Sequence, residues 1–158
     1  MARAYIGLGA NLGDLAATLR AAIAALEALP HTRLAAVSSA WRSAPVDAGG
    51  PDYLNAVVRL ETALAPEPLL DALQAIERAY GRERPYVNAP RTLDLDLLLY
   101  DDLAMQSVRL TLPHPRLHQR AFVLHPLLEV APERSDLAAH LPAVADQQLD
   151  KTEEDLHP

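Results

Sequence analysis

Between residues 93 and 97 the chain alternates strictly between leucine and aspartate, reading Leu-Asp-Leu-Asp-Leu. Successive side chains of a β-strand point to opposite faces of a sheet. The segment therefore predicts a strand that buries Leu93, Leu95 and Leu97 and presents Asp94 and Asp96 on the opposite face. Such a strand requires a sheet whose apolar face is covered by other elements.

The two aspartates are candidate metal ligands. At about 3.3 Å per residue their Cα atoms would lie roughly 6.6 Å apart, a separation from which two carboxylates can converge on one ion. Carboxylate oxygens suit Mg²⁺, which commonly takes one or two carboxylates and completes its shell with water and phosphate oxygens. The alternative is a solvated sheet face with two ordinary aspartates, and for an isolated Asp-x-Asp this alternative is the more common case.

Arginines flank the aspartate strand on both sides. Active sites for phosphoryl transfer typically combine carboxylates that bind a metal ion with guanidinium groups that bind phosphate. A surface ion pair is the alternative for each arginine and remains the default for Arg59 and Arg78. No glycine-rich Walker sequence is present, so a P-loop enzyme is not expected. The flanking arginines are Arg82, Arg84, Arg91, Arg109, Arg116 and Arg120.

Hydrophobic periodicity predicts the remaining elements. The order strand, helix, strands, helix, strand favours an α+β sandwich with helices packed on a mostly antiparallel sheet. Two intervening segments, residues 44–52 and 82–91, are rich in Gly, Pro and charge, and we expect loops that close when ligands bind. The predicted elements are a strand over residues 4–9, a helix from residue 15 to Pro30, strands within 34–43 and over 53–62, and a helix over 66–80.

Four further side chains are candidates for ligand contacts. Alternation within residues 53–62 places Tyr53 and Asn55 together on the face opposite the core. Tyr53 and Phe122 are possible walls of a stacking site for a flat ring, with core packing as the alternative. His114 stands between two prolines, and donation to a phosphate and capping of a turn are equally good readings.

Composition excludes several classes of protein. The 158 residues carry a formal charge of -7 and no cysteine, which excludes a disulfide scaffold, a zinc finger and a thiol nucleophile and fits a reducing cytoplasm. Broad electrostatic capture of nucleic acid is disfavoured, and no apolar stretch is long enough for a membrane span. We expect a monomer with a single domain over residues 1–145, followed by an acidic, flexible tail over residues 146–158.

Five ordered motifs give the chain a specific resemblance. They occupy residues 5–14, 51–57, 76–77 with 81–82, 90–96, and 113–116 with 120–124. With these motifs the chain resembles the 6-hydroxymethyl-7,8-dihydropterin pyrophosphokinase family, whose members pass pyrophosphate from ATP to a pterin, release AMP and belong to the folate pathway. The match covers about residues 4–133, nearly the whole chain.

The resemblance implies a ferredoxin-like α+β sandwich and assigns roles to individual residues. Two Mg²⁺ ions would bind Asp94 and Asp96, and the catalytic residues would be these two with Arg82 and Arg91. The pterin would stack between Tyr53 and Phe122 and be read by Asn55, Ser43 and Val46. ATP would be held by Gln74, Glu77, Arg82, Arg84, Arg91, Leu97, Arg109, Thr111, His114 and Arg120.

The loop before the aspartate strand departs from the family pattern. Members often carry Arg-Trp-Gly just before the Pro-Arg, whereas residues 84–91 read Arg-Pro-Tyr-Val-Asn-Ala-Pro-Arg, without Trp. A large apolar cap normally helps a lid to exclude water. Two other function classes therefore stay open beside the enzyme: a module that binds nucleotide or pterin without turnover, and a Mg²⁺-dependent phosphohydrolase.

Overall fold

The computed structural model describes residues 1–45, 50–80 and 93–158. Within these residues, six strands form one sheet in the order β5-β1-β4-β3-β8, with β2 also paired to β4. Every pairing in this sheet is antiparallel, as the sequence predicted. Its strands are β1 (Ala2–Ala10), β2 (Thr32–Val37), β3 (Trp41–Ser43), β4 (Tyr53–Thr62), β5 (Asp94–Tyr100) and β8 (Leu149–Lys151).

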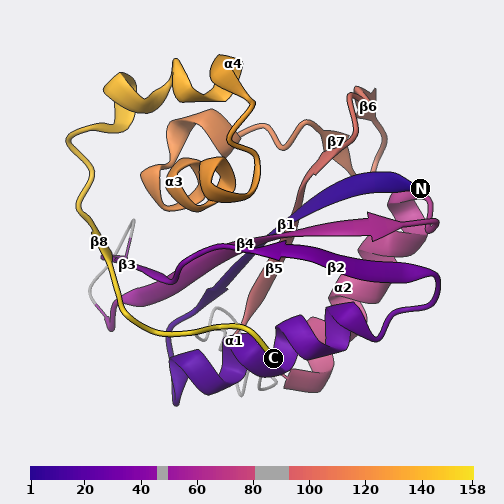
Figure 1. Cartoon of the computed structure of the whole chain (residues 1–158), viewed down its shortest axis with the longest axis horizontal. Helices are drawn as coiled ribbons and strands as arrows, with labels where there is room; N and C mark the ends of the chain where they lie inside the picture. Colours follow the sequence, from indigo (N-terminus) through magenta and orange to yellow (C-terminus); the bar gives the residue numbers. More distant parts are fainter. Residues whose placement is uncertain (46–49, 81–92) are drawn as a thin grey trace.

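Helices cover both faces of the sheet (Figure 1). α1 (Leu15–Glu27) and α2 (Pro66–Tyr80) pack on one face, and α3 (Ala121–Val130) packs on the other. Asp14 caps α1, because its side chain accepts a hydrogen bond from the backbone N–H of Ala17 at 3.1 Å. The smaller elements are the hairpin of β6 (Met105–Gln106) and β7 (Thr111–Leu112), α4 (Ser135–Ala138) and the 3₁₀ turns Leu117–Gln119 and Leu141–Val144.

The alternation in β5 sorts its side chains as predicted. Leu93, Leu95 and Leu97 are almost fully buried in the core beneath α1 and α2, whereas Asp94 and Asp96 lie on the opposite face. The pairing with β1 then shifts by one residue, because Ile6 pairs with Leu97 and Tyr5 with Leu99. This bulge at Leu98 places both Leu98 and Leu99 against α3. One strand thus supplies a polar surface at its start and an apolar one at its end.

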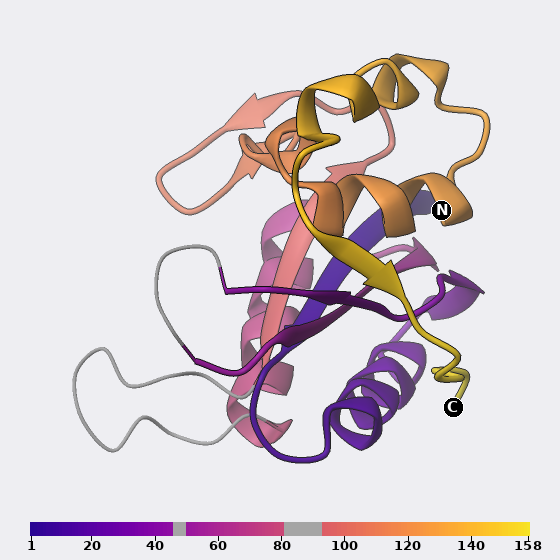
Figure 2. The same cartoon turned by 90° about the vertical axis from the view of Figure 1, so that its left-hand side faces the viewer.

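The last 13 residues, which their charge predicts to be a flexible tail, contribute a strand and a buried side chain to the fold. β8 pairs with β3, and Leu156 is 1% exposed within the core beneath α1 and α2. Arg20 of α1 donates to the carbonyl of Asp155 at 3.0 Å, and the C-terminus lies beside α1 (Figures 1 and 2). The net charge of this segment does not predict its docking, because docking depends on the burial of Leu156 and on pairing with the edge of β3.

Removal of residues 146–158 should therefore destabilise the protein. The deletion exposes the edge of β3 and empties the site of Leu156, and truncation of one buried leucine alone costs about 2–5 kcal/mol. We expect urea denaturation to show a loss of at least about 3 kcal/mol in the free energy of unfolding. A chain ending at Leu156 is the control and should keep most of its stability. Equal stability of the long deletion and the full chain would contradict the docking.

In the part of the chain that the structure describes, no helix has both the length and the apolar character needed to cross a bilayer.

Candidate active site

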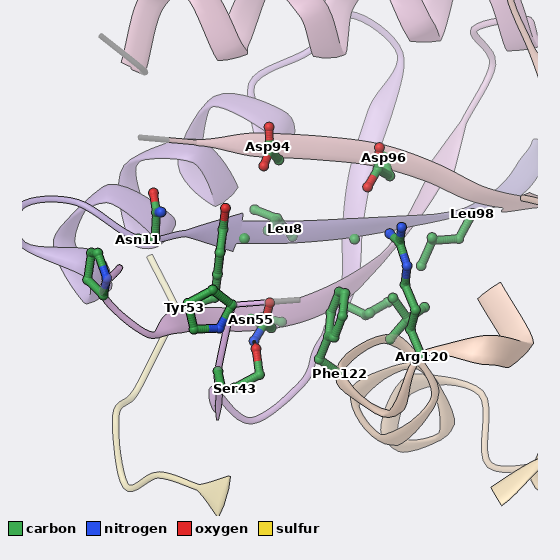
Figure 3. Close-up of a pocket in the computed structure, with 18 of the residues that line it drawn as sticks. Leu8, Asn11, Ser43, Tyr53, Asn55, Asp94, Asp96, Leu98, Arg120 and Phe122 are labelled. Atoms are coloured by element: carbon green, nitrogen blue, oxygen red, sulfur yellow. Dashed lines mark hydrogen bonds between the residues drawn. The ribbon is translucent and has the colours of Figure 1, made fainter. Parts of the chain in front are cut away.

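A cavity of about 410 Å³ lies on the sheet face that α3 covers only in part. The helix packs against Val57, Leu98 and Leu99, and beyond them the same face opens into the cavity. Residues from four strands and from the start of α3 meet there (Figure 3). The cavity brings together seven of the residues predicted from sequence: Ser43, Tyr53, Asn55, Asp94, Asp96, Arg120 and Phe122.

Two glycines of β1 form the floor of the cavity. Gly9 pairs with Asp94 on one side and Asn55 on the other, and Gly7 pairs with Asp96. A Cβ atom on Gly9 would lie 3.4 Å from Oδ1 of Asn55. Because neither glycine has a side chain, the surface of β1 stays open between Asp94 and Asp96 on β5 and Asn55 on β4. Sequence reasoning missed this role, although glycines two apart in a predicted strand share one face.

The acidic end of the cavity is formed by β5. Both carboxylates project from the same face of the strand, and Tyr53 extends from β4 across β1 toward Asp94 (Figure 3). Burial raises the pKa of the Tyr53 hydroxyl, and the nearby Asp94 carboxylate raises it further. Tyr53 therefore stays a neutral phenol at physiological pH.

The donor set at this end fits magnesium. Among residues 1–45, 50–80 and 93–158, no group of three or more His, Cys, Asp or Glu side chains could enclose a metal ion. Asp94 and Asp96 both line the cavity and supply two carboxylates to it. Mg²⁺ typically binds in this way, with substrate phosphates and water as its other ligands.

The opposite end of the cavity is amide and aromatic. Asn55 donates both hydrogens of its side-chain Nδ2, one to the carbonyl of Trp41 at 3.0 Å and one to Oγ of Ser43 at 2.8 Å. Its Oδ1 is then the atom that can accept from a ligand. Phe122 stands on the first turn of α3, with the guanidinium of Arg120 5.5 Å from its ring centre. An aromatic wall and a fixed hydrogen-bonding edge suit a flat, polar ring.

Asn11 also lines the cavity, and sequence reasoning did not single it out. It follows the last residue of β1 and is 7% exposed. Its Oδ1 is buried and accepts no hydrogen bond from the residues that the structure describes. Buried polar atoms are normally paired, so this oxygen is a polar group of the cavity wall whose hydrogen-bonding capacity the described residues leave unused.

His114 lies beside the acidic end of the cavity. Its backbone N–H donates to the carbonyl of Leu98 at 2.9 Å, and its Nδ1 accepts from the backbone N–H of Arg116 at 3.2 Å. The neutral ring therefore carries its proton on Nε2, where it can donate to an anion. Burial lowers the pKa of the imidazole, Asp96 raises it, and Arg120 and Arg116 lower it. The turn contact and the donor role, which the sequence left as alternatives, are compatible.

We expect His114 to titrate below its ordinary pKa of 6.5. The folded chain favours the neutral His114 ring over the protonated one. The contribution of His114 to the free energy of unfolding is therefore complete at a pH above the pKa of this ring in the unfolded chain. It is lost as the pH falls through the lower pKa of the ring in the folded chain. Asp96→Asn removes the charge that opposes this shift and should lower the pKa further. NMR titration of the imidazole Hε1 resonance checks both statements. A His114 pKa above 6.5 in the native chain would contradict the first, and an unchanged pKa in Asp96→Asn would contradict the second.

A second polar group borders the outer edge of β5, outside the cavity lining. Glu77 of α2 accepts from the backbone N–H of Leu95 at 2.8 Å. Arg109 donates to Asp71 at 2.5 Å and to Oε1 of Gln74 at 3.4 Å. Thr111 is exposed on β7, which contacts β5. These predicted residues therefore do not line the cavity.

Leu97, another predicted site residue, has a side chain that faces away from the cavity. Its side chain is 3% exposed in the core beneath α1 and α2, because the alternation that turns Asp96 toward the cavity turns Leu97 away. Only its backbone is available for ligand contacts. Val46, Arg82, Arg84 and Arg91 lie outside the described residues.

Residues 5–132 match the family described as 7,8-dihydro-6-hydroxymethylpterin-pyrophosphokinase. The chain belongs to this family. A 2-amino-4-hydroxy-6-hydroxymethyldihydropteridine pyrophosphokinase of Pseudomonas aeruginosa is 47% identical over 142 residues, covering 89% of this chain and 88% of the relative. A pyrophosphokinase of the same description from Haemophilus influenzae is also 47% identical, over 132 residues, covering 83% of this chain and 82% of the relative.

The fold of the pyrophosphokinase family is also found by structural comparison. A crystal structure described as HPPK-DHPS in complex with substrates matches with a TM-score of 0.69 at 11% sequence identity. The alignment covers 92% of this chain and 44% of that longer chain. The α+β ferredoxin-like architecture predicted from sequence is confirmed.

Proposed function

We propose that the chain transfers pyrophosphate from ATP to the hydroxymethyl group of 6-hydroxymethyl-7,8-dihydropterin, releasing AMP, as a step of folate biosynthesis. The observation that carries this proposal is the single cavity in which two carboxylates and an amide-aromatic slot face each other across a glycine floor. Membership of the pyrophosphokinase family supports the same reaction. The chain has both the metal-binding chemistry and the ring-binding chemistry that this transfer needs.

The acidic end is the proposed phosphate subsite. Two Mg²⁺ ions at Asp94 and Asp96 would neutralise charge on the triphosphate and on the transferred group. Arg120 and the Nε2 proton of His114 would contact phosphate oxygens from the side of α3. ATP would extend past the outer edge of β5, toward Gln74, Glu77, Arg109 and Thr111. Arg82, Arg84 and Arg91 complete the proposed ATP site, Arg82 and Arg91 as catalytic residues.

The amide-aromatic end is the proposed pterin subsite. The ring would stack between Tyr53 and Phe122, while Oδ1 of Asn55 accepts from a ring N–H and residues 43 and 46 contact the same edge. In this pose the hydroxymethyl group points across the floor to the acidic end. Its oxygen would bond to the β-phosphorus as the bond from that phosphorus to the α-phosphate oxygen breaks, and the hydroxyl proton would leave to solvent.

An assay of AMP formation tests the proposal. We expect AMP only when ATP, Mg²⁺ and the pterin are all present. Formation of ADP would end the pyrophosphokinase assignment, and ATP loss that does not depend on pterin would indicate a phosphohydrolase. Ligand binding without turnover at high protein concentration would indicate a binding module. We also propose a cytoplasmic monomer, for which light scattering should return about 17.2 kDa.

A further inference from the structure

A carboxylate outside the cavity joins α3 to β3. Glu129, in the last turn of α3, accepts hydrogen bonds from Nε1 of Trp41 at 2.6 Å and from Oγ of Ser39 at 2.7 Å. The backbone N–H of Ser39 lies 3.3 Å from both of its oxygens, and Nζ of Lys151 on β8 lies 3.9 Å away. One side chain thus gathers donors from β3, from the segment before it and from β8.

The ring of Trp41 is held on further sides. His125, one turn before Glu129 on α3, stacks on it with ring centres 5.3 Å apart. The ammonium of Lys151 lies 5.7 Å from its ring centre on β8. β3 has only three residues, so these contacts and its two neighbouring strands fix its position.

The position of β3 in turn fixes the hydrogen-bonding edge of the cavity. The carbonyl of Trp41 and the hydroxyl of Ser43 take both hydrogens of the Asn55 amide. This orientation leaves Oδ1 of Asn55 toward the cavity (Figure 3). A displacement of β3 would release the amide and let it rotate.

The same helix carries the aromatic wall. Phe122 and Glu129 are seven residues apart on α3, which is about 10.5 Å along the helix axis. Glu129 links one end of α3 to β3, and Phe122 stands on the first turn at the other end. We infer that Glu129 is a positioning residue: through Trp41 and Ser39 it sets the width of the slot that receives the flat ring. This inference rests on the proposed function, because it takes the ring to be the pterin.

Binding measurements on variants of the full chain test the inference. We expect Glu129→Ala to weaken pterin binding about tenfold by calorimetry, the loss expected when a fixed hydrogen-bonding edge is released. The titration includes Mg²⁺ and the α,β-methylene analogue of ATP, which cannot be cleaved at the reacting bond. The affinity for that analogue should stay within about twofold, since the acidic end is built by β5. Glu129→Gln, which keeps an acceptor for Trp41, should restore most of the pterin affinity.

A matched control separates positioning from loss of stability. Leu137→Ala removes a buried side chain of α4 from the hydrophobic cluster that includes α3, and it should lower stability without changing pterin affinity. The chain has one tryptophan, so its emission reports on Trp41 alone and should shift to the red in Glu129→Ala but not in Leu137→Ala. Equal weakening of pterin binding by both variants, or none by Glu129→Ala, would overturn the inference.

One readout does not need the pterin. In Glu129→Ala the side-chain amide resonances of Asn55 should move in ¹⁵N-correlated NMR spectra, and in Leu137→Ala they should stay in place. If the native chain binds no pterin, the proposed function fails. The Asn55 resonances still test whether the contact of Glu129 with β3 holds the Asn55 amide in place. Unmoved Asn55 resonances in Glu129→Ala would then overturn it.

Discussion

Asp96→Asn is expected to reduce the rate of AMP formation by about 10³-fold, the equivalent of roughly 4 kcal/mol of lost charge stabilisation in the transition state. Asparagine has the same shape as aspartate and keeps a carbonyl oxygen, so the fold of β5 is preserved. It carries no negative charge, however, and binds a hard divalent cation poorly. Asp94→Asn should have an effect of the same order, because both carboxylates share one face and one cavity.

Chromatographic quantification of AMP over a range of Mg²⁺ concentrations provides the measurement. Raising Mg²⁺ should recover part of the lost rate if the substitution weakens metal binding. Asp102→Asn is the matched control, since Asp102 is an exposed aspartate just beyond the end of β5. Its rate should change by no more than about twofold, as for most surface substitutions. Native rates in both Asp94→Asn and Asp96→Asn would remove the basis for the metal site.

Gly9→Val is expected to abolish pterin binding while the protein stays folded. The backbone of Gly9 is not in the left-handed region, and valine is favoured in strands, so β1 should accept it. The new side chain would project into the row between Asp94 and Asn55, where a Cβ atom already lies 3.4 Å from Oδ1 of Asn55 and 3.8 Å from the ring of Tyr53. It would occupy the space of the bound ring.

We expect calorimetry to show pterin affinity at least about 100-fold weaker in Gly9→Val, or about 2.7 kcal/mol. Urea denaturation should give a stability within about 1 kcal/mol of the native chain. Arg3→Val is the control, because it adds the same side chain to an exposed position of β1 outside the cavity. Native pterin affinity in Gly9→Val would show that the ring binds elsewhere.

The faces of the strands and helices were predictable from local periodicity. The period of two placed Asp94 and Asp96 on one face of β5 and paired Tyr53 with Asn55 on β4, and the cavity contains all four. Helical spacing likewise predicted the two helices α1 and α2. These predictions succeed because which way a side chain points depends on the backbone of its own element.

Contacts between distant segments were beyond the reach of such patterns. The glycine floor becomes a site only when β4 and β5 flank β1, and the slot forms only because α3 stops short of covering that face. Glu129 contacts Trp41 although 88 residues separate them in the chain. The acidic C-terminal segment docks because β8 pairs with the edge of β3 and because Leu156 is buried in the core. Local sequence therefore specifies the chemistry that each element offers. The packing of these elements against one another decides which of those groups come into contact. This packing cannot be predicted from a local pattern, because it depends on the fit and burial of side chains over the whole chain.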